Sequence, residues 1–158
     1  EEMEHILLLP FFTGIGSPYW KADAKAAIVG LTRDSGPSHI ARACLDGIAL
    51  SINDLICAMR KDTSLSIGQL KVDGGAVENN LLMHIQSTIS ELKVIRPKVI
   101  ETTAYGAALA AAIGVGRIGM SDMSKFWQMD KEFTPTQDEL SFYQKKKTQW
   151  TSTIQKLY

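Results

Sequence analysis

Two adjacent glycines, Gly74 and Gly75, follow a short apolar segment at residues 70–73 and precede a segment with helical periodicity. Because neither residue has a Cβ atom, the main chain can adopt positive φ values and can approach a ligand closely. The helix that follows directs its free N–H groups and the positive end of its dipole toward the turn, where an anion is stabilised. The pattern therefore predicts either a phosphate-binding turn or a tight strand-to-helix connection without a ligand.

Size and charge narrow the possible classes of protein. The 158 residues suffice for one domain, and a hydrophobic content of 45% suffices for a core. Basic and acidic side chains number 17 each, so no overall field attracts nucleic acid or an anionic membrane surface. The chain also has no apolar run of the roughly 20 residues that a bilayer-spanning helix needs. We therefore expect a globular domain that binds neither nucleic acid nor membrane.

The two cysteines, Cys44 and Cys57, lie 13 positions apart in one predicted helix. At that separation they are about 20 Å apart along the helix axis, which is too far for a disulfide. Two unpaired thiols that face the core are typical of a reducing compartment, and we expect a cytoplasmic location.

The spacing of apolar residues predicts a layered α/β fold. Residues 6–12 and 26–31 are predicted as strands, the second as a strand or a hairpin arm, and a long helix is expected from an N-cap at Ser38 to about residue 62. Strands at residues 70–73 and 94–95 alternate with helices at residues 81–92 and 102–112, and a final amphipathic helix covers residues 137–158. This order predicts a parallel sheet that binds its ligand at the carboxyl ends of the strands, where Gly74 and Gly75 lie.

Two predictions concern the surroundings of the glycine pair. The helix after residue 101, with Thr102 or Thr103 as its N-cap, consists almost entirely of small residues, so we expect it to pack tightly beneath the glycine turn. Asp73, at the end of the strand, either accepts N–H groups of its own turn or holds a metal-bound water, and the first is favoured because Asp commonly caps its local backbone.

Several catalytic motifs are absent from the sequence. It has no Gly-x-Ser-x-Gly, no Gly-x-x-x-x-Gly-Lys-Ser/Thr, no His-Glu-x-x-His, no Cys-x-x-Cys and no Gly-x-Gly-x-x-Gly. The three histidines lie in different segments, and His39 is interpreted as a surface residue of a first helical turn. Neither a catalytic residue nor a metal ligand is assigned from these patterns.

Four separated segments resemble a single family. Residues 10–20, 26–46, 73–83 and 101–108 match, in order and spacing, the C-terminal lobe of the FGGY carbohydrate kinases, and within that family the glycerol kinases. The match runs from about residue 6 to the end. Cys44 and Thr88 depart from the usual pattern, as do Lys25 and Ala26, and these departures bear on subfamily and rate more than on nucleotide binding.

The resemblance implies an actin-like, ribonuclease-H-like fold, of which residues 1–158 are an incomplete C-terminal nucleotide-binding lobe, truncated at its N-terminal side. It implies ATP (or ADP) and Mg²⁺ as cofactors and transfer of the γ-phosphoryl group to glycerol. Gly74 and Gly75 would pack against the adenosine and α-phosphate, and Asn79 would hydrogen-bond the nucleotide. The catalytic base and most glycerol contacts are expected in the part of the kinase that precedes this chain.

The 158 residues alone are therefore expected to bind nucleotide weakly and to phosphorylate nothing. Unpaired sheet edges and exposed apolar surface lead us to expect a homo-oligomer. Two alternatives remain open: a kinase of another polyol or sugar, and a non-catalytic nucleotide-binding or assembly module on the same fold.

Overall fold

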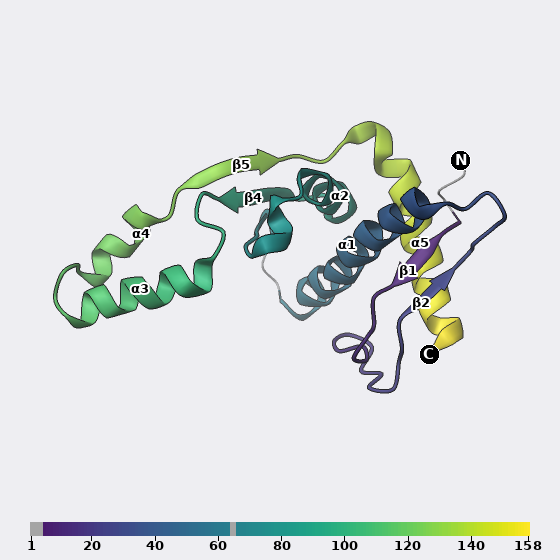
Figure 1. The fold of residues 1–158 in the computed structure, drawn as a ribbon, viewed down its shortest axis with the longest axis horizontal. Helices are drawn as coiled ribbons and strands as arrows, with labels where there is room; N and C mark the ends of the chain where they lie inside the picture. The colour runs from purple at the N-terminus through teal and green to yellow at the C-terminus, as the bar shows by residue number, and fades with distance from the viewer. Residues whose placement is uncertain (1–4, 64–65) are drawn as a thin grey trace.

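The structure is a computed structural model that describes residues 5–63 and 66–158. Its α-helices and β-strands alternate along most of the chain, and three short 3₁₀ helices (η) join them (Figure 1). In chain order the elements are β1 (Leu7–Leu9), β2 (Ala27–Val29), α1 (Pro37–Asp62), β3 (Gln69–Lys71), η1 (Gly75–Glu78), α2 (Asn80–Ser90), β4 (Lys93–Pro97), α3 (Thr102–Gly114), η2 (Met120–Asp122), α4 (Met123–Phe126), β5 (Met129–Phe133), η3 (Gln137–Glu139) and α5 (Leu140–Leu157).

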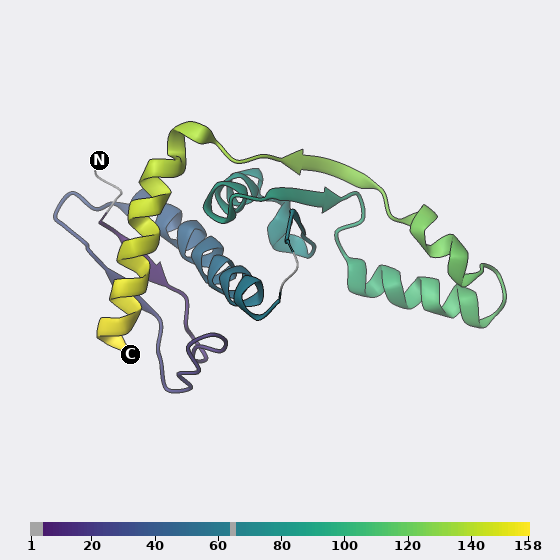
Figure 2. The ribbon, with the colours of Figure 1, turned by 180° about the vertical axis from the view of Figure 1, so that it is seen from behind.

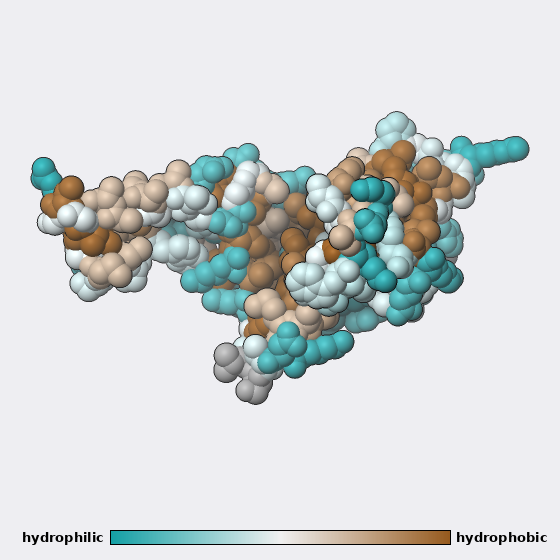
Figure 3. All heavy atoms as spheres, turned by 90° about the horizontal axis from the view of Figure 1, so that it is seen from below, coloured by the Kyte–Doolittle hydropathy of each residue, from teal (hydrophilic) through white to brown (hydrophobic). Residues whose placement is uncertain are grey.

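The molecule is elongated and consists of a body and an arm. The body contains α1, α2, α5 and the strand pair β1–β2, whereas α3 and α4 extend away from it as an arm that β4 and β5 connect to the body (Figures 1 and 2). Apolar side chains are visible both over the body and at the end of the arm (Figure 3).

The first two strands form an antiparallel pair in which Leu7 lies opposite Val29. Helix α1 packs on β1 and comes close to it at Gly47, where an added Cβ atom would lie 2.1 Å from the carbonyl oxygen of Leu8. Only glycine fits this contact, so the sequence of α1 fixes where the helix crosses the strand. The predicted strands at residues 6–12 and 26–31 are thus confirmed, although both are shorter than expected.

The second sheet has the order β3-β4-β5. β3 is parallel to β4, with Leu70 opposite Val94, whereas β5 is antiparallel to β4, with Phe133 opposite Val94. The prediction of a parallel sheet is correct for the first pair only. β5 was not predicted because its first four residues are exposed and three of them are charged. The segment therefore lacks the apolar alternation of a strand.

The core lies between α1, α2 and α5 and the strands β1 and β4. Helix α5 contributes its buried side chains Tyr143, Trp150 and Ile154 at helical spacing, and α2 contributes Ile85 and Ile89. The main cluster also includes Leu7, Leu9, Phe11, Ile15, Ala24, Ala49, Leu50, Val77, Leu82, Met83, Val94 and Phe133. The chain thus buries a continuous apolar interior without the arm.

The start of α1 differs from the prediction. Its N-cap is Gly36 rather than Ser38, Pro37 occupies the first turn, and the N–H of Gly36 donates to Nδ1 of His39 at 2.9 Å. Proline suits the first helical position because its fixed φ is helical and it lacks an N–H group. His39 therefore takes part in the capping interaction that the sequence assigned to Ser38.

Helix α3 also differs from the prediction. Its N-cap is Glu101, which makes no side-chain capping bond, and none of the residues of α3 is buried. The small residues therefore do not pack tightly beneath the glycine turn within the part of the chain that the structure describes. Tyr105 instead joins the helix to α4 by donating from its hydroxyl to the carbonyl oxygen of Phe126 at 3.4 Å.

Cys44 and Cys57 are both free thiols, and Cys57 is exposed, contrary to the expectation that it faces the core. None of the helices in the described ranges combines the length and the apolar character that crossing a bilayer requires.

Candidate functional site

The glycine turn lies at the carboxyl end of β3, as predicted. β3 ends at Lys71, the N–H of Val72 still donates to the carbonyl oxygen of Ile95 on β4 at 3.1 Å, and the chain then turns at Asp73 and Gly74 into η1. This edge, where two parallel strands end side by side, is the place at which α/β sheets of this kind bind ligands.

Two contacts tie the turn to the loop that follows β4. The N–H of Gly74 donates to the carbonyl oxygen of Ile100 at 2.8 Å, and the Thr102 hydroxyl donates to Oδ2 of Asp73. Asp73 thus bonds the start of α3 and not its own turn, so the favoured sequence interpretation was wrong. The turn after β3 and the loop after β4 are therefore held together by hydrogen bonds.

The surface over the two glycines is open. Gly74 has φ 84°, a conformation that L residues with a side chain rarely adopt, whereas Gly75 is not among the glycines with positive φ. Apart from its chain neighbours and the adjacent helical backbone, a Cβ atom built on either residue would have no described atom within 4 Å. The geometry of the turn explains Gly74, but neither backbone conformation nor packing within the described residues explains Gly75. A glycine there suits a surface that something outside the chain approaches.

The helix geometry after the glycines differs from the expectation. The glycine pair leads into the four-residue η1, and α2 begins only at Asn80. Asn79 is the N-cap of α2, and its Oδ1 accepts the N–H of Leu82 at 3.1 Å. The dipole of α2 therefore does not start at the glycines. The main-chain donors nearest the open surface are the N–H groups of Gly75 and Ala76, which precede the first hydrogen bond within η1.

Arg96 lies behind the turn and was not identified from the sequence. It projects from β4 and donates from Nη1 to the carbonyl oxygen of Val77 at 2.8 Å and to Oδ1 of Asn80 at 3.0 Å. A single arginine in a short strand before a proline carries no recognisable pattern. Its position would have been suspected only from the pairing of β3 with β4.

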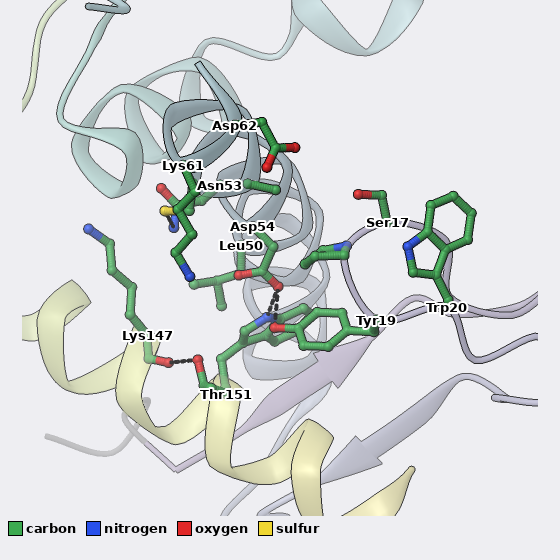
Figure 4. A pocket seen from close by; sticks show the side chains of 14 residues that line it. Ser17, Tyr19, Trp20, Leu50, Asn53, Asp54, Lys61, Asp62, Lys147 and Thr151 are labelled. Atoms are coloured by element: carbon green, nitrogen blue, oxygen red, sulfur yellow. Dashed lines mark hydrogen bonds between the residues drawn. The ribbon is translucent and has the colours of Figure 1, made fainter. Parts of the chain in front are cut away.

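A cavity of about 580 Å³ lies elsewhere, between α1, α5 and the loop at residues 17–20 (Figure 4). At its wall Oδ2 of Asp54 accepts the Tyr19 hydroxyl at 3.0 Å and the Trp150 indole N–H at 2.7 Å. Burial raises the pKa of Asp54, and the two hydrogen bonds oppose that rise. Burial and the nearby Asp54 carboxylate raise the pKa of Tyr19. These contacts join the loop and α5 to α1.

Residues 5–63 and 66–158 contain no cluster of three or more His, Cys, Asp or Glu side chains that could hold a metal ion. Thr88, which replaces an aspartate usual in the resembled family, is buried, and its hydroxyl donates to the carbonyl oxygen of His84 at 2.9 Å. It accepts the N–H of Thr136 at 3.1 Å, so it serves packing between α2 and the segment before α5.

The sequence of this chain matches a known protein family. The sequence profile of the FGGY family of carbohydrate kinases, C-terminal domain, matches residues 1–115. The glycerol kinase of Aromatoleum aromaticum is 45% identical over 139 residues, and glycerol kinase 1 of Saccharolobus solfataricus is 44% identical over 140 residues. These alignments cover 87% and 88% of the chain but only 28% of each relative.

Solved structures agree with the sequence comparison. The crystal structure of Plasmodium falciparum glycerol kinase with ADP superposes with a TM-score of 0.82 and 30% identity, covering 99% of this chain and 31% of that one. A xylulose kinase from Lactobacillus acidophilus has the same TM-score at 24% identity, covering 98% of this chain and 32% of that one, and supports the fold alone. The predicted α/β, actin-like kinase lobe is confirmed.

Proposed function

Since the chain belongs to the FGGY family of carbohydrate kinases, we propose that it is the ATP-binding part of a glycerol kinase. Such an enzyme transfers the γ-phosphoryl group of ATP to glycerol and forms glycerol 3-phosphate. The chain spans 28% of the length of the glycerol kinases that it matches. The groups that bind glycerol and remove its proton would therefore belong to the remainder of the kinase.

The observation that carries this proposal is Gly75. Its main chain lies on an open surface where a Cβ atom would have no described atom within 4 Å apart from its chain neighbours, and yet the residue has none. A nucleotide that approaches the main chain at this point accounts for the absence of a Cβ atom. The position at the ends of β3 and β4 supports the same ligand.

Three groups would make the contacts with ATP. The N–H groups of Gly75 and Ala76 would donate to the α-phosphate side of the nucleotide, and the glycine main chain would pack against the adenosine. The amide of Asn79, whose Oδ1 already caps α2, would offer its NH₂ group to the nucleotide. Donors fixed in the folded state need no reorganisation during transfer, which is how a protein lowers the barrier of a phosphoryl transfer.

Mg²⁺ would arrive on the phosphates of ATP, where it neutralises charge during transfer. We assign no residue of this chain to the metal, because the described residues offer no three-member ligand cluster. The contribution of the chain is to bind and orient the nucleotide.

The setting that we propose is cytoplasmic and homo-oligomeric, with ATP and glycerol as small-molecule partners and without nucleic acid or membrane. The two free thiols support the cytoplasmic location. The formal net charge of zero supports the absence of nucleic-acid and membrane partners.

The test is a calorimetric titration of the 158-residue chain with ADP, together with a coupled assay of glycerol-dependent ADP release. We expect weak saturable binding that Gly75→Val abolishes, and no turnover by this chain. The whole polypeptide that carries this sequence should turn over glycerol in preference to xylulose or gluconate. Absence of saturable ADP binding by both proteins would contradict the proposal, and ADP binding by both without turnover of any acceptor would favour a non-catalytic module.

A further inference from the structure

We propose that Arg96 is a positioning residue of the nucleotide site, which holds the main chain after Gly75 in the geometry that binds ATP. This inference rests on the proposed function. Arg96 does not touch the open surface itself; it acts on the opposite end of η1.

The guanidinium group meets the carbonyl end of η1. Nη1 donates to the carbonyl oxygen of Val77 at 2.8 Å and, over a longer distance of 3.4 Å, to that of Glu78. The same nitrogen donates to Oδ1 of Asn80, the first residue of α2, at 3.0 Å. One nitrogen therefore joins the end of η1 to the start of α2.

The other side of the guanidinium is fixed by β5. Nε and Nη2 each lie 2.8 Å from Oδ2 of Asp130, and Cζ lies 5.4 Å from the ring centroid of Phe133. The side chain of Arg96 is only 13% exposed. A planar group that is held along one edge by a carboxylate and against a buried ring has little freedom, so its remaining edge presents Nη1 in a fixed direction.

The turn needs such an anchor because η1 is short. Hydrogen bonds in a 3₁₀ turn have poorer geometry than those in an α-helix. All main-chain groups of a helical turn point the same way, carbonyl oxygens toward its C-terminus and N–H groups toward its N-terminus. A cation that fixes the carbonyl oxygens of Val77 and Glu78 therefore also sets the direction of the N–H groups of Gly75 and Ala76.

The test uses Arg96→Met, Arg96→Lys and, as a control, Asp130→Asn in the whole polypeptide that carries this sequence. Asp130→Asn keeps the bonds to η1 and an oxygen acceptor for the guanidinium group, and removes only the negative charge of the pair with β5. We expect Arg96→Met to raise the dissociation constant for ADP about tenfold, with the KM for the acceptor unchanged. Arg96→Lys should not restore the affinity, because an ammonium group cannot span η1 and Asp130 as the fork does. Asp130→Asn should shift the affinity about threefold or less.

Hydrogen exchange separates this inference from the proposed function, since it needs no ligand. In Arg96→Met the amides of Val77 and Asn79, which are hydrogen-bonded within η1, should exchange faster than in Asp130→Asn. If wild type binds ADP and Arg96→Met binds it equally well, the positioning role is overturned while the proposed function stands. Wild-type affinity in Arg96→Lys would also overturn it, because charge alone would then suffice. If wild type binds no nucleotide, the proposed function fails, and unchanged exchange in η1 would overturn the role of Arg96 independently.

Discussion

The ammonium group of Lys146 on α5 lies 2.5 Å from Oδ2 of Asp46 on α1, and the two side chains are 2% and 1% exposed. The other carboxylate oxygen accepts Arg42 Nε at 3.1 Å and the Tyr143 hydroxyl at 3.2 Å. Burial and the nearby Asp46 raise the pKa of Tyr143. The C-terminal helix is therefore joined to α1 by a buried ionic network as well as by apolar packing.

We expect Lys146→Met to lower the free energy of unfolding by about 3–5 kcal/mol, because it leaves the carboxylate of Asp46 buried without its closest cation. Urea denaturation followed by circular dichroism measures this change. Lys147→Met is the matched control: its partner Glu91 is half exposed, and a surface pair of this kind contributes about 0–1 kcal/mol. Equal losses for the two variants would contradict the assignment of Asp46 as a buried charge.

The two glycines should respond differently to alanine. Gly74→Ala places a side chain at φ 84° and should lower the free energy of unfolding by about 1–2 kcal/mol. Gly75→Ala meets no described atom and should change stability by less than about 0.5 kcal/mol, while it weakens ADP binding. Urea denaturation and calorimetric titration measure the two effects. A Gly75→Ala variant that binds ADP as wild type does would remove the support that Gly75 gives to the nucleotide site.

Asp54 should make stability fall as the pH rises. Burial raises its pKa in the folded state above the unfolded value, so the folded state retains the proton over a window that starts near the ordinary pKa of about 4 and extends upward. Stability from this group is full below that window and is lost as the pH rises through it. Asn can still accept the bonds from Tyr19 and Trp150, but it does not ionise.

Relative to wild type, Asp54→Asn should therefore gain stability between pH 4 and pH 7. The measurement is the difference in free energy of unfolding at the two values. A difference that stays constant, or that changes in the opposite direction, would show that the environment of Asp54 does not disfavour its charge.

Self-association is expected of the 158-residue chain. Helix α3 buries none of its residues, and the arm exposes large apolar side chains, including Val115, Met120, Met123 and Trp127. Apolar surface of this kind favours association in water. Sedimentation velocity should give a species larger than a monomer, and charged replacements of Val115 and Met120 should reduce its size. A monomer at micromolar concentration would refute this expectation.

Helices α1, α2 and α5 could be predicted because one face of each is buried. In α2, Ile85 and Ile89 lie four positions apart and both are buried. The spacing of apolar residues in the sequence therefore predicts which face of the helix packs against the core. β5 could not be predicted, since Phe133 is the only one of its five residues that is buried. Its position comes from pairing with β4, which is a tertiary interaction and leaves little trace in a five-residue segment.

In the candidate site, too, the local feature could be predicted from the sequence, whereas the contacts between distant residues could not. The turn at Gly74 and Gly75 is local, and its place at the end of a strand was predicted. The contact between Asp73 and Thr102 joins residues 29 positions apart, and Arg96 reaches residues 16 to 19 positions away. Both depend on the parallel register of β3 and β4, which places two chain segments at one edge. Residue types alone do not specify such a register.

The contact of Arg96 with the carbonyl oxygens of Val77 and Glu78 also affects how the sequence can evolve. Every amino acid carries a main-chain carbonyl group, so the exposed residue at position 78 can be exchanged without the loss of an acceptor. Position 96 has no such freedom, because only arginine supplies this fork of donors. Under the positioning role proposed for Arg96, the outer surface of the turn can therefore change in sequence while its shape depends on one residue of a neighbouring strand.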